Sequence, residues 1–194
     1  MSVARYIALE GAEGCGKSTQ AAALATDLDA LLTRETGGTE IGLRIRDILH
    51  DIATVGLAPA AELLLTAADR AQHMAEIVAP ALESGRHVVS DRSVYSALAY
   101  QGYGRELDIV EVRRINDWAL GARWPDLVVL IEADDATLST RMAGKQLDRF
   151  EQEDDAFHRR VSDGFRVMAA GDPQRWVVID GNGSADEVHE AVRA

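Results

Sequence analysis

Short apolar runs alternate along the chain with longer stretches in which apolar residues recur every three or four positions. The short runs predict strands at residues 6–10, 30–33, 87–90, 127–132 and 176–180. The longer stretches predict helices at residues 18–28, 41–49, 60–82, 107–120, 136–142, 155–170 and 185–192. Short buried strands that alternate with helices are typical of βα units, so the pattern predicts an α/β fold around a parallel sheet.

Two features modify this pattern. Pro59 suits the first turn of the long helix, and Pro80 predicts a kink near its end. Residues 143–154, AGKQLDRFEQED, have no clear period and are too polar for the core, so we predict a mobile lid at about residues 142–154. The chain of 194 residues shows no repeat and no linker, and we expect a single domain over residues 1–194.

Charge and composition exclude several function classes. The net charge of −12 and the pI near 4.8 argue against a nucleic-acid polymer or an anionic membrane as partner. A single cysteine excludes an internal disulfide bond. No apolar run approaches about 18 residues, so we expect no transmembrane helix. The strand pattern begins within a few residues of the N-terminus and leaves no room for a signal peptide, so we expect a cytoplasmic protein.

The most informative segment follows the first predicted strand. Residues 11–18, GAEGCGKS, match the phosphate-binding pattern GxxxxGK[ST] between a strand and a helix, as that motif requires. The glycines let backbone N–H groups point at a phosphate, the helix N-terminus and Lys17 add positive charge, and Ser18 can reach Mg²⁺. The predicted phosphate site comprises Gly11, Ala12, Glu13, Gly14, Cys15, Gly16, Lys17, Ser18 and Thr19.

Four further polar segments lie downstream. They are residues 33–39 (TRETGGT), 67–73 (AADRAQH), 91–102 (DRSVYSALAYQG) and 148–151 (DRFE). The first three lie at strand ends, or on a helix able to pack over them, where ligands bind in open α/β sheets. They supply Arg34, Arg70 and Arg92, whose guanidinium groups suit a second phosphate. Two phosphate sites in one cleft suggest phosphoryl transfer between nucleotides.

Together with the phosphate loop, these segments resemble bacterial thymidylate kinases from about Arg5 to the C-terminus. The family pattern reads TREPGGT, FAADRAQH, DRYxxSSxAYQG and DRFE in this order. The chain departs from it at Thr36 for Pro, Thr66 for Phe, Ser93 for Tyr and Ala97 for Ser. The resemblance implies a five-stranded parallel sheet with helices on both faces, and a homodimer. It also implies transfer from ATP·Mg²⁺ to dTMP, giving ADP and dTDP.

The resemblance also assigns roles around dTMP. Arg92 is expected on the acceptor phosphate, with assistance from Arg34 and Arg46. Arg70 and Gln101 are expected on the thymine edge, and Tyr100 against the sugar, where its ring leaves little space for a 2′-hydroxyl. Thr66 is one helical turn before Arg70, so both share a face that the resemblance directs at the base. The predicted dTMP site comprises Glu13, Arg34, Arg46, Thr66, Arg70, Arg92, Ser96, Tyr100 and Gln101.

Catalysis of phosphoryl transfer is mostly positioning and charge stabilisation. Lys17 is one source of positive charge, and the variable loop positions contain no basic residue. The resemblance favours a second source in the lid, where we expect Arg149 as a catalytic residue. Arg141 and Lys145 are expected at ATP, with a solvated surface as the alternative. Asp91 and Ser18 are expected to hold Mg²⁺, and the alternative for Asp91 is a helix N-cap.

A carboxylate inside an anion-binding loop requires an explanation. Polyphosphate would repel Glu13, so its side chain should turn away from the donor nucleotide. It then either accepts from the 3′-hydroxyl of dTMP or reaches Mg²⁺ through water, and we expect it among the catalytic residues. The alternative is an exposed loop carboxylate without a role.

Other chemistries find less support in the sequence. No NKxD motif follows the phosphate loop, since the two lysines lie in GKS and GKQ, which disfavours a GTPase switch. The five histidines are scattered without metal-ligand spacing. Two alternatives therefore stay open: another P-loop nucleoside or nucleotide kinase, and a nucleotide-binding regulator without turnover.

Overall fold

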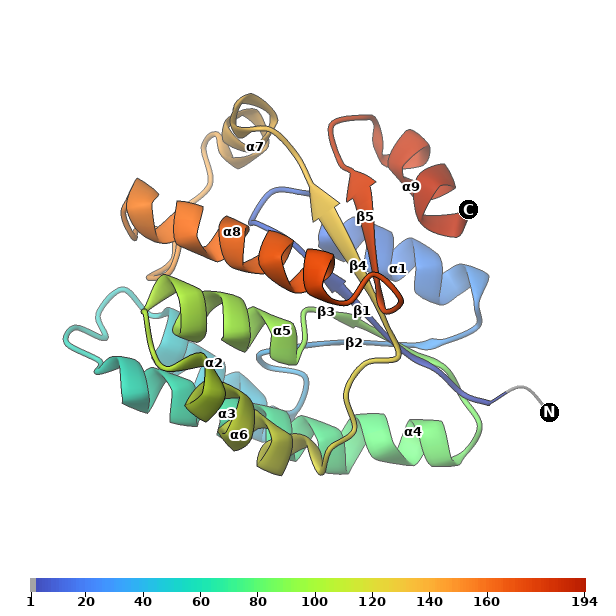
Figure 1. Ribbon diagram of the computed structural model, residues 1–194, viewed down its shortest axis with the longest axis horizontal. Coiled ribbons are helices and arrows are strands. Elements are labelled where there is room, and N and C mark those ends of the chain that lie inside the picture. The colour runs from blue at the N-terminus through green and yellow to red at the C-terminus, as the bar shows by residue number, and fades with distance from the viewer. Residues whose placement is uncertain (1–2) are drawn as a thin grey trace.

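A computed structural model describes residues 3–194 (Figure 1). The strands are β1 (Tyr6–Glu10), β2 (Leu31–Arg34), β3 (Val88–Asp91), β4 (Leu127–Glu132) and β5 (Trp176–Asp180). The α-helices are α1 (Lys17–Asp27), α2 (Glu40–His50), α3 (Pro59–His73), α4 (Ala79–Glu83), α5 (Val94–Ala97), α6 (Ile109–Leu120), α7 (Asp135–Met142), α8 (Asp155–Gly171) and α9 (Ala185–Arg193). Two π-helical segments are η1 (Met74–Val78) and η2 (Leu98–Gly104).

The strands form one parallel sheet in the order β2-β3-β1-β4-β5, which confirms the predicted fold class (Figure 1). The central strand is β1, where Leu9 is level with Asp91 of β3 and with Val129 of β4. Because all the strands run the same way, their carboxyl ends meet at one edge of the sheet. The phosphate loop follows β1 and therefore begins in the middle of that edge.

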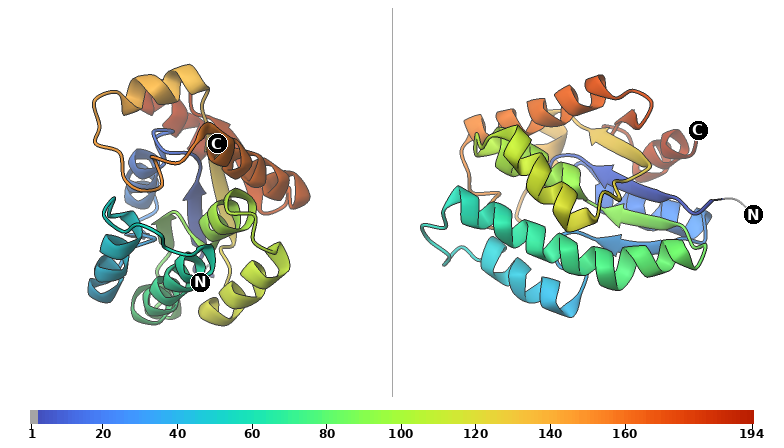
Figure 2. Two further views of the ribbon diagram at one scale, coloured as in Figure 1. Left: turned by 90° about the vertical axis from the view of Figure 1, so that its left-hand side faces the viewer. Right: turned by 60° about the horizontal axis from the view of Figure 1, so that its bottom comes forward.

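Alternate residues of each buried strand serve opposite faces of the sheet. In β4, Val128 and Leu130 join the apolar cluster under α3, α6 and α8, whereas Val129 and Ile131 join the cluster under α1 and α9. Helices therefore cover both faces, as Figure 2 shows. Within residues 3–194, no helix is both long enough and apolar enough to cross a membrane.

Two helical segments differ from the prediction. The helix expected over residues 60–82 is divided, because the π-helical segment η1 precedes Pro80, which lies in the first turn of α4. Pro80 has no N–H to continue the α-helical ladder, and a wide turn accommodates it. The helical segment 94–104 was not predicted as an element at all. Its short α-helix passes directly into the π-helical η2, so no sustained helical period exists in this sequence.

Residues 143–154 connect α7 to α8 and lie across the carboxyl end of the sheet (Figure 2). The mobile lid expected over these residues stays a prediction, and in the structure the segment contacts the end of α2. Asp148 Oδ2 is 2.6 Å from Nδ1 of His50, and the backbone N–H of Arg149 donates to the His50 carbonyl at 3.2 Å. The segment therefore has a defined docking position against α2.

Candidate active site

A cavity of about 1060 Å³ opens at the carboxyl ends of the strands. The phosphate loop forms its floor, and the ends of β2, β3 and β4 contribute the polar side chains around it. Its walls come from α3, η2 and α8, and the connection after α7 contributes Leu147, Asp148, Phe150 and Glu151. The position agrees with the general rule that open α/β sheets bind ligands beyond their strand ends.

The phosphate loop has the backbone geometry that its glycines predict. Gly11 and Gly16 have φ values of 143° and 100°, which residues with a Cβ atom rarely adopt. Gly16 caps α1, so Lys17 and Ser18 occupy the first turn, where backbone N–H groups are unsatisfied. Cys15 is buried among apolar residues, and only its backbone can serve the loop.

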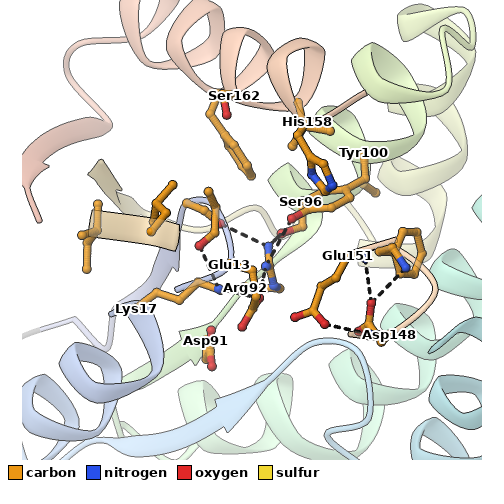
Figure 3. Close-up of a pocket in the computed structure, with 18 of the residues that line it drawn as sticks. Glu13, Lys17, Asp91, Arg92, Ser96, Tyr100, Asp148, Glu151, His158 and Ser162 are labelled. Carbon is orange, nitrogen blue, oxygen red and sulfur yellow. Dashed lines mark hydrogen bonds and ion pairs between the residues drawn. The ribbon is translucent and has the colours of Figure 1, made fainter. Parts of the chain in front are cut away.

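Glu13 lies between two cations in the centre of the cavity (Figure 3). Its Oε2 atom accepts from Nζ of Lys17 at 3.0 Å and from an Nη atom of Arg92 at 2.9 Å. Burial acts to raise the pKa of Glu13, but Lys17 and Arg92 lower it to about 2. Glu13 is therefore an ionised carboxylate that joins the phosphate loop to the end of β3, rather than a free loop residue.

Arg92 reaches into the cavity from the end of β3 with a left-handed φ of 72°. Besides Glu13, its guanidinium donates to Oγ of Ser96 at 3.1 Å and to the Tyr100 hydroxyl at 3.3 Å. Burial acts to lower the pKa of Arg92, yet Tyr100, Glu13 and Glu10 raise it well above its usual range. The group thus stays charged although it is removed from water.

Arg34 and Arg46 line the same cavity as Arg92. Burial lowers the pKa of Arg46, and the neighbouring charges of Arg34 and Arg92 lower it further. The guanidinium group of Arg46 is therefore close enough to those of Arg34 and Arg92 to be repelled by both. Such a cluster suits a dianionic ligand, and the assignment of these residues to the acceptor phosphate stays a prediction.

Asp91 lies at the end of β3 opposite the phosphate loop. Its Oδ2 accepts from the Ser18 hydroxyl at 2.5 Å, and its buried Oδ1 has no hydrogen-bond partner within residues 3–194. The alternative of a helix N-cap is wrong, because Ser93 caps α5. A hydroxyl and an unsatisfied carboxylate oxygen side by side fit the oxygen ligands that Mg²⁺ prefers.

The three residues predicted at the base line one part of the cavity. Thr66 and Arg70 share a face of α3, and the Thr66 hydroxyl donates to the carbonyl of Leu63 at 2.8 Å. Arg70 donates to Glu35 at 2.9 Å and also to Asn116. Gln101 enters from η2, so elements distant in sequence form this part of the cavity.

The basic residues of the predicted lid separate into two groups. Arg141 donates to the carbonyls of Cys15 and Gly183 at 3.3 and 2.9 Å, and lines with Lys145 a second cavity of about 360 Å³ beside the phosphate loop. Arg149 instead donates to Glu62 at 2.7 Å and to the Leu49 carbonyl at 2.7 Å. Its predicted catalytic role stays a prediction, since its donors point to α2 and α3.

Several residues that line the cavity or lie behind it had not been predicted from the sequence. His158 and Ser162 enter from α8 above Tyr100 (Figure 3). Glu10 lies behind Arg92, fully buried, and accepts from the hydroxyls of Ser93 and Ser96 at 2.7 and 2.6 Å. Burial raises the pKa of Glu10 from 4.5 to about 7, against the opposing charge of Arg92.

This raised pKa makes stability depend on pH. Between pH 4.5 and about 7 the folded protein holds the Glu10 proton more tightly than the unfolded chain does, so the free energy of unfolding falls as pH rises. The change should be about 3 kcal/mol. Urea unfolding at pH 5 and pH 8 measures this, and the free energy of unfolding of Glu10→Gln should change less between the two pH values than that of the native protein. Equal pH dependence in the two proteins would contradict this assignment.

Comparison with known proteins agrees with this geometry. Residues 9–192 match the family model described as thymidylate kinase. A thymidylate kinase of Halothermothrix orenii is 43% identical over 196 residues, which cover 96% of this chain and 93% of that protein. One of Leifsonia xyli is 45% identical over 196 residues, covering 97% and 92%. The crystal structure of thymidylate kinase from Ehrlichia chaffeensis superposes with a TM-score of 0.82 at 31% identity, covering 99% of this chain and 98% of that one. The chain therefore belongs to the thymidylate kinase family.

Proposed function

We propose that the main cavity holds ATP phosphates at the phosphate loop and dTMP at the arginine cluster, with the reacting groups meeting beside Glu13. The enzyme phosphorylates dTMP with ATP, a step in dTTP synthesis, as the family membership establishes. A phosphate oxygen of dTMP attacks the γ-phosphorus of ATP, and the bond from that phosphorus to the bridging oxygen breaks. The observation that supports this arrangement is the Glu13 carboxylate, which contacts both Lys17 and Arg92.

Each charged group then has a distinct task. Lys17 stabilises charge on the transferred group, and Arg92 orients the acceptor phosphate with Arg34 and Arg46. Glu13 keeps both cations in place and offers an acceptor to the sugar side of dTMP. Arg141 and Lys145 hold the donor nucleotide at the second cavity.

Ser18 and Asp91 would hold magnesium, because they place a hydroxyl and an unsatisfied carboxylate oxygen together. When bound, the ion neutralises negative charge on the phosphate oxygens. We expect Asp91→Asn to raise the Mg²⁺ concentration for half-maximal activity by about tenfold, as a charged ligand becomes neutral. A magnesium titration at fixed ATP measures this, with the exposed Glu190→Gln as control. An unchanged midpoint in Asp91→Asn would exclude this ligand assignment.

Thr66 replaces the aromatic residue of the family pattern and lines the proposed base site. Its hydroxyl hydrogen is committed to the Leu63 carbonyl, so it adds no donor for the base. Thr66→Phe should lower the Kd and KM for dTMP by about tenfold, since base stacking is worth about 1–3 kcal/mol. The kcat should stay within about twofold, because the base is remote from the transferred group.

A dTMP titration and initial rates measure the effect, and Thr66→Leu separates stacking from simple filling of space. Weaker binding in the Phe variant would show that the slot is already occupied, or that Thr66 does not face the base.

We also propose a homodimer. Leu64 of α3 is 57% exposed, and Val110 and Trp118 of the neighbouring α6 are 67% and 85% exposed. Large apolar side chains exposed on adjacent helices are typical of protein interfaces. Sedimentation velocity distinguishes a dimer from the 21.0 kDa monomer.

The substrate assignment is tested by ADP release with dTMP, dUMP, dCMP, dGMP and thymidine as acceptors. We expect the highest kcat/KM with dTMP. Preference for another monophosphate or for thymidine would place the enzyme with other nucleotide or nucleoside kinases. A protein that binds ATP but releases no ADP with any of them would be a regulator.

A further inference from the structure

Glu62 of α3 is fully buried, and nitrogen donors surround both of its carboxylate oxygens. Oε1 accepts from Nε2 of Gln101 at 2.9 Å and from Nε of Arg105 at 3.2 Å. Oε2 accepts from Nη atoms of Arg105 and Arg149 at 3.1 and 2.7 Å. A carboxylate offers about four acceptor positions, and here four N–H groups occupy them.

This carboxylate determines how the Gln101 amide is turned. Glu62 can only accept, so Gln101 must direct its NH₂ group toward Glu62 and its carbonyl oxygen away from it. Gln101 lines the cavity beside Thr66 and Arg70. No group within residues 3–194 donates to its Oε1 atom, which is thus available as an acceptor.

We propose that Glu62 is a positioning residue that makes the base site select pyrimidines with an N–H group at ring position 3. The inference rests on the proposed function, which puts the base beside Gln101. Thymine and uracil carry a hydrogen on N3 that the Gln101 oxygen accepts, whereas cytosine has a lone pair there. The Gln101 oxygen and the cytosine N3 atom are both acceptors, so in a buried site each would stay without a hydrogen-bond donor. An unpaired buried acceptor costs binding energy, and this cost discriminates strongly against cytosine.

The same carboxylate ties base selection to the segment over the cavity. Arg149 contacts Glu62 from residues 143–154, and Arg105, which follows η2, is in turn 2.6 Å from Glu153. The two guanidinium groups meet at Oε2, so an acceptor is required at that position. In a substituted side chain that has only one acceptor oxygen, that oxygen should therefore face Arg149, and none is left to accept from Gln101.

Glu62→Gln tests the proposal, because only one end of the new amide can accept. With its oxygen toward Arg149, its NH₂ group faces Gln101, whose amide must turn over and present its own NH₂ to the base. We expect the ratio of kcat/KM for dTMP to that for dCMP to fall by at least about tenfold. The ratio for dTMP to dUMP should change by less than about threefold, since both bases carry the N3 hydrogen.

Matched variants separate positioning from support of the fold. Glu62→Asp keeps an acceptor-only group and should largely restore the dTMP to dCMP ratio, and the exposed Glu76→Gln should leave it unchanged. In a Gln101→Leu background, Glu62→Gln should no longer alter the ratio, because the group through which it acts is gone. Thermal unfolding of each variant reports the fold separately.

An unchanged dTMP to dCMP ratio in a folded Glu62→Gln protein, with all acceptors weakened alike, would overturn the inference. Titration of dTMP and dCMP against the native and variant proteins gives the same ratio from Kd values, independently of turnover. Failure of the native enzyme to phosphorylate dTMP would instead count against the proposed function, and the two results are distinguishable.

Discussion

Lys17→Ala should lower kcat by about 10³ or more, because the substitution removes a preorganised positive charge from the phosphate loop. The Lys17 side chain is 4% exposed, and its ammonium group is 3.2 Å from the Ala12 carbonyl within the loop. Water that enters the space left by Lys17 carries no net charge and must reorient to stabilise the transferred group, whereas the ammonium group is already in position. Single-turnover rates at saturating ATP and dTMP measure the loss directly.

The exposed Arg193→Ala is the matched control for loss of one cation, and circular dichroism checks the fold. Glu13 keeps Arg92 as a partner in the Lys17 variant, so the loop retains a compensated carboxylate. A kcat within tenfold of the native value would show that Lys17 is not a principal source of stabilising charge.

Arg92→Lys should lower kcat/KM for dTMP by about 10²–10³, although the charge is retained. Lysine cannot reproduce the planar guanidinium fork, and each charge-assisted hydrogen bond is worth about 1.5–3 kcal/mol. The fork also links Glu13 to Ser96 and Tyr100, so its loss displaces the acceptor side of the site.

The KM for ATP should change by less than about threefold, since Arg92 serves the acceptor. Initial rates with either substrate varied in turn separate the two effects, and Arg193→Lys controls for the exchange itself. An equal loss of kcat/KM for ATP and for dTMP would show that Arg92 supports the structure of the loop and does not act specifically on the acceptor.

Local signals explain why much of the fold could be predicted. The run LVVLIE predicts β4 because this interior parallel strand is covered on both faces, and its four middle residues are buried. The glycines of residues 11–16 mark the phosphate loop by their backbone requirements. The segment 94–104 carries no such signal. Its helical conformation depends on packing, since a Cβ atom on Gly104 would lie 2.7 Å from Phe157, 53 residues later in the chain.

The candidate site residues that lie in sequence motifs could be predicted. Those whose surroundings depend on tertiary contacts could not. Lys17, Asp91 and Arg92 were expected together because they follow adjacent strands. Glu10 and Glu62 lie within apolar sequence, YIALE and AAELLL, and nothing local shows which donors surround a buried carboxylate. The pairing of Arg149 with Glu62 likewise spans 87 residues and depends on where the connection after α7 docks.

Cys15 is the only cysteine of the chain, and its sulfur is buried in the apolar cluster beneath α1. A thiol-specific probe added to the native protein should therefore find little to react with. A new cysteine at the half-exposed Leu147, and a second one on α9, would then take fluorophores or spin labels without competition from Cys15. The distance from such a label to a second one on α9 would report how residues 143–154 move during turnover, without first removing a residue from the phosphate loop.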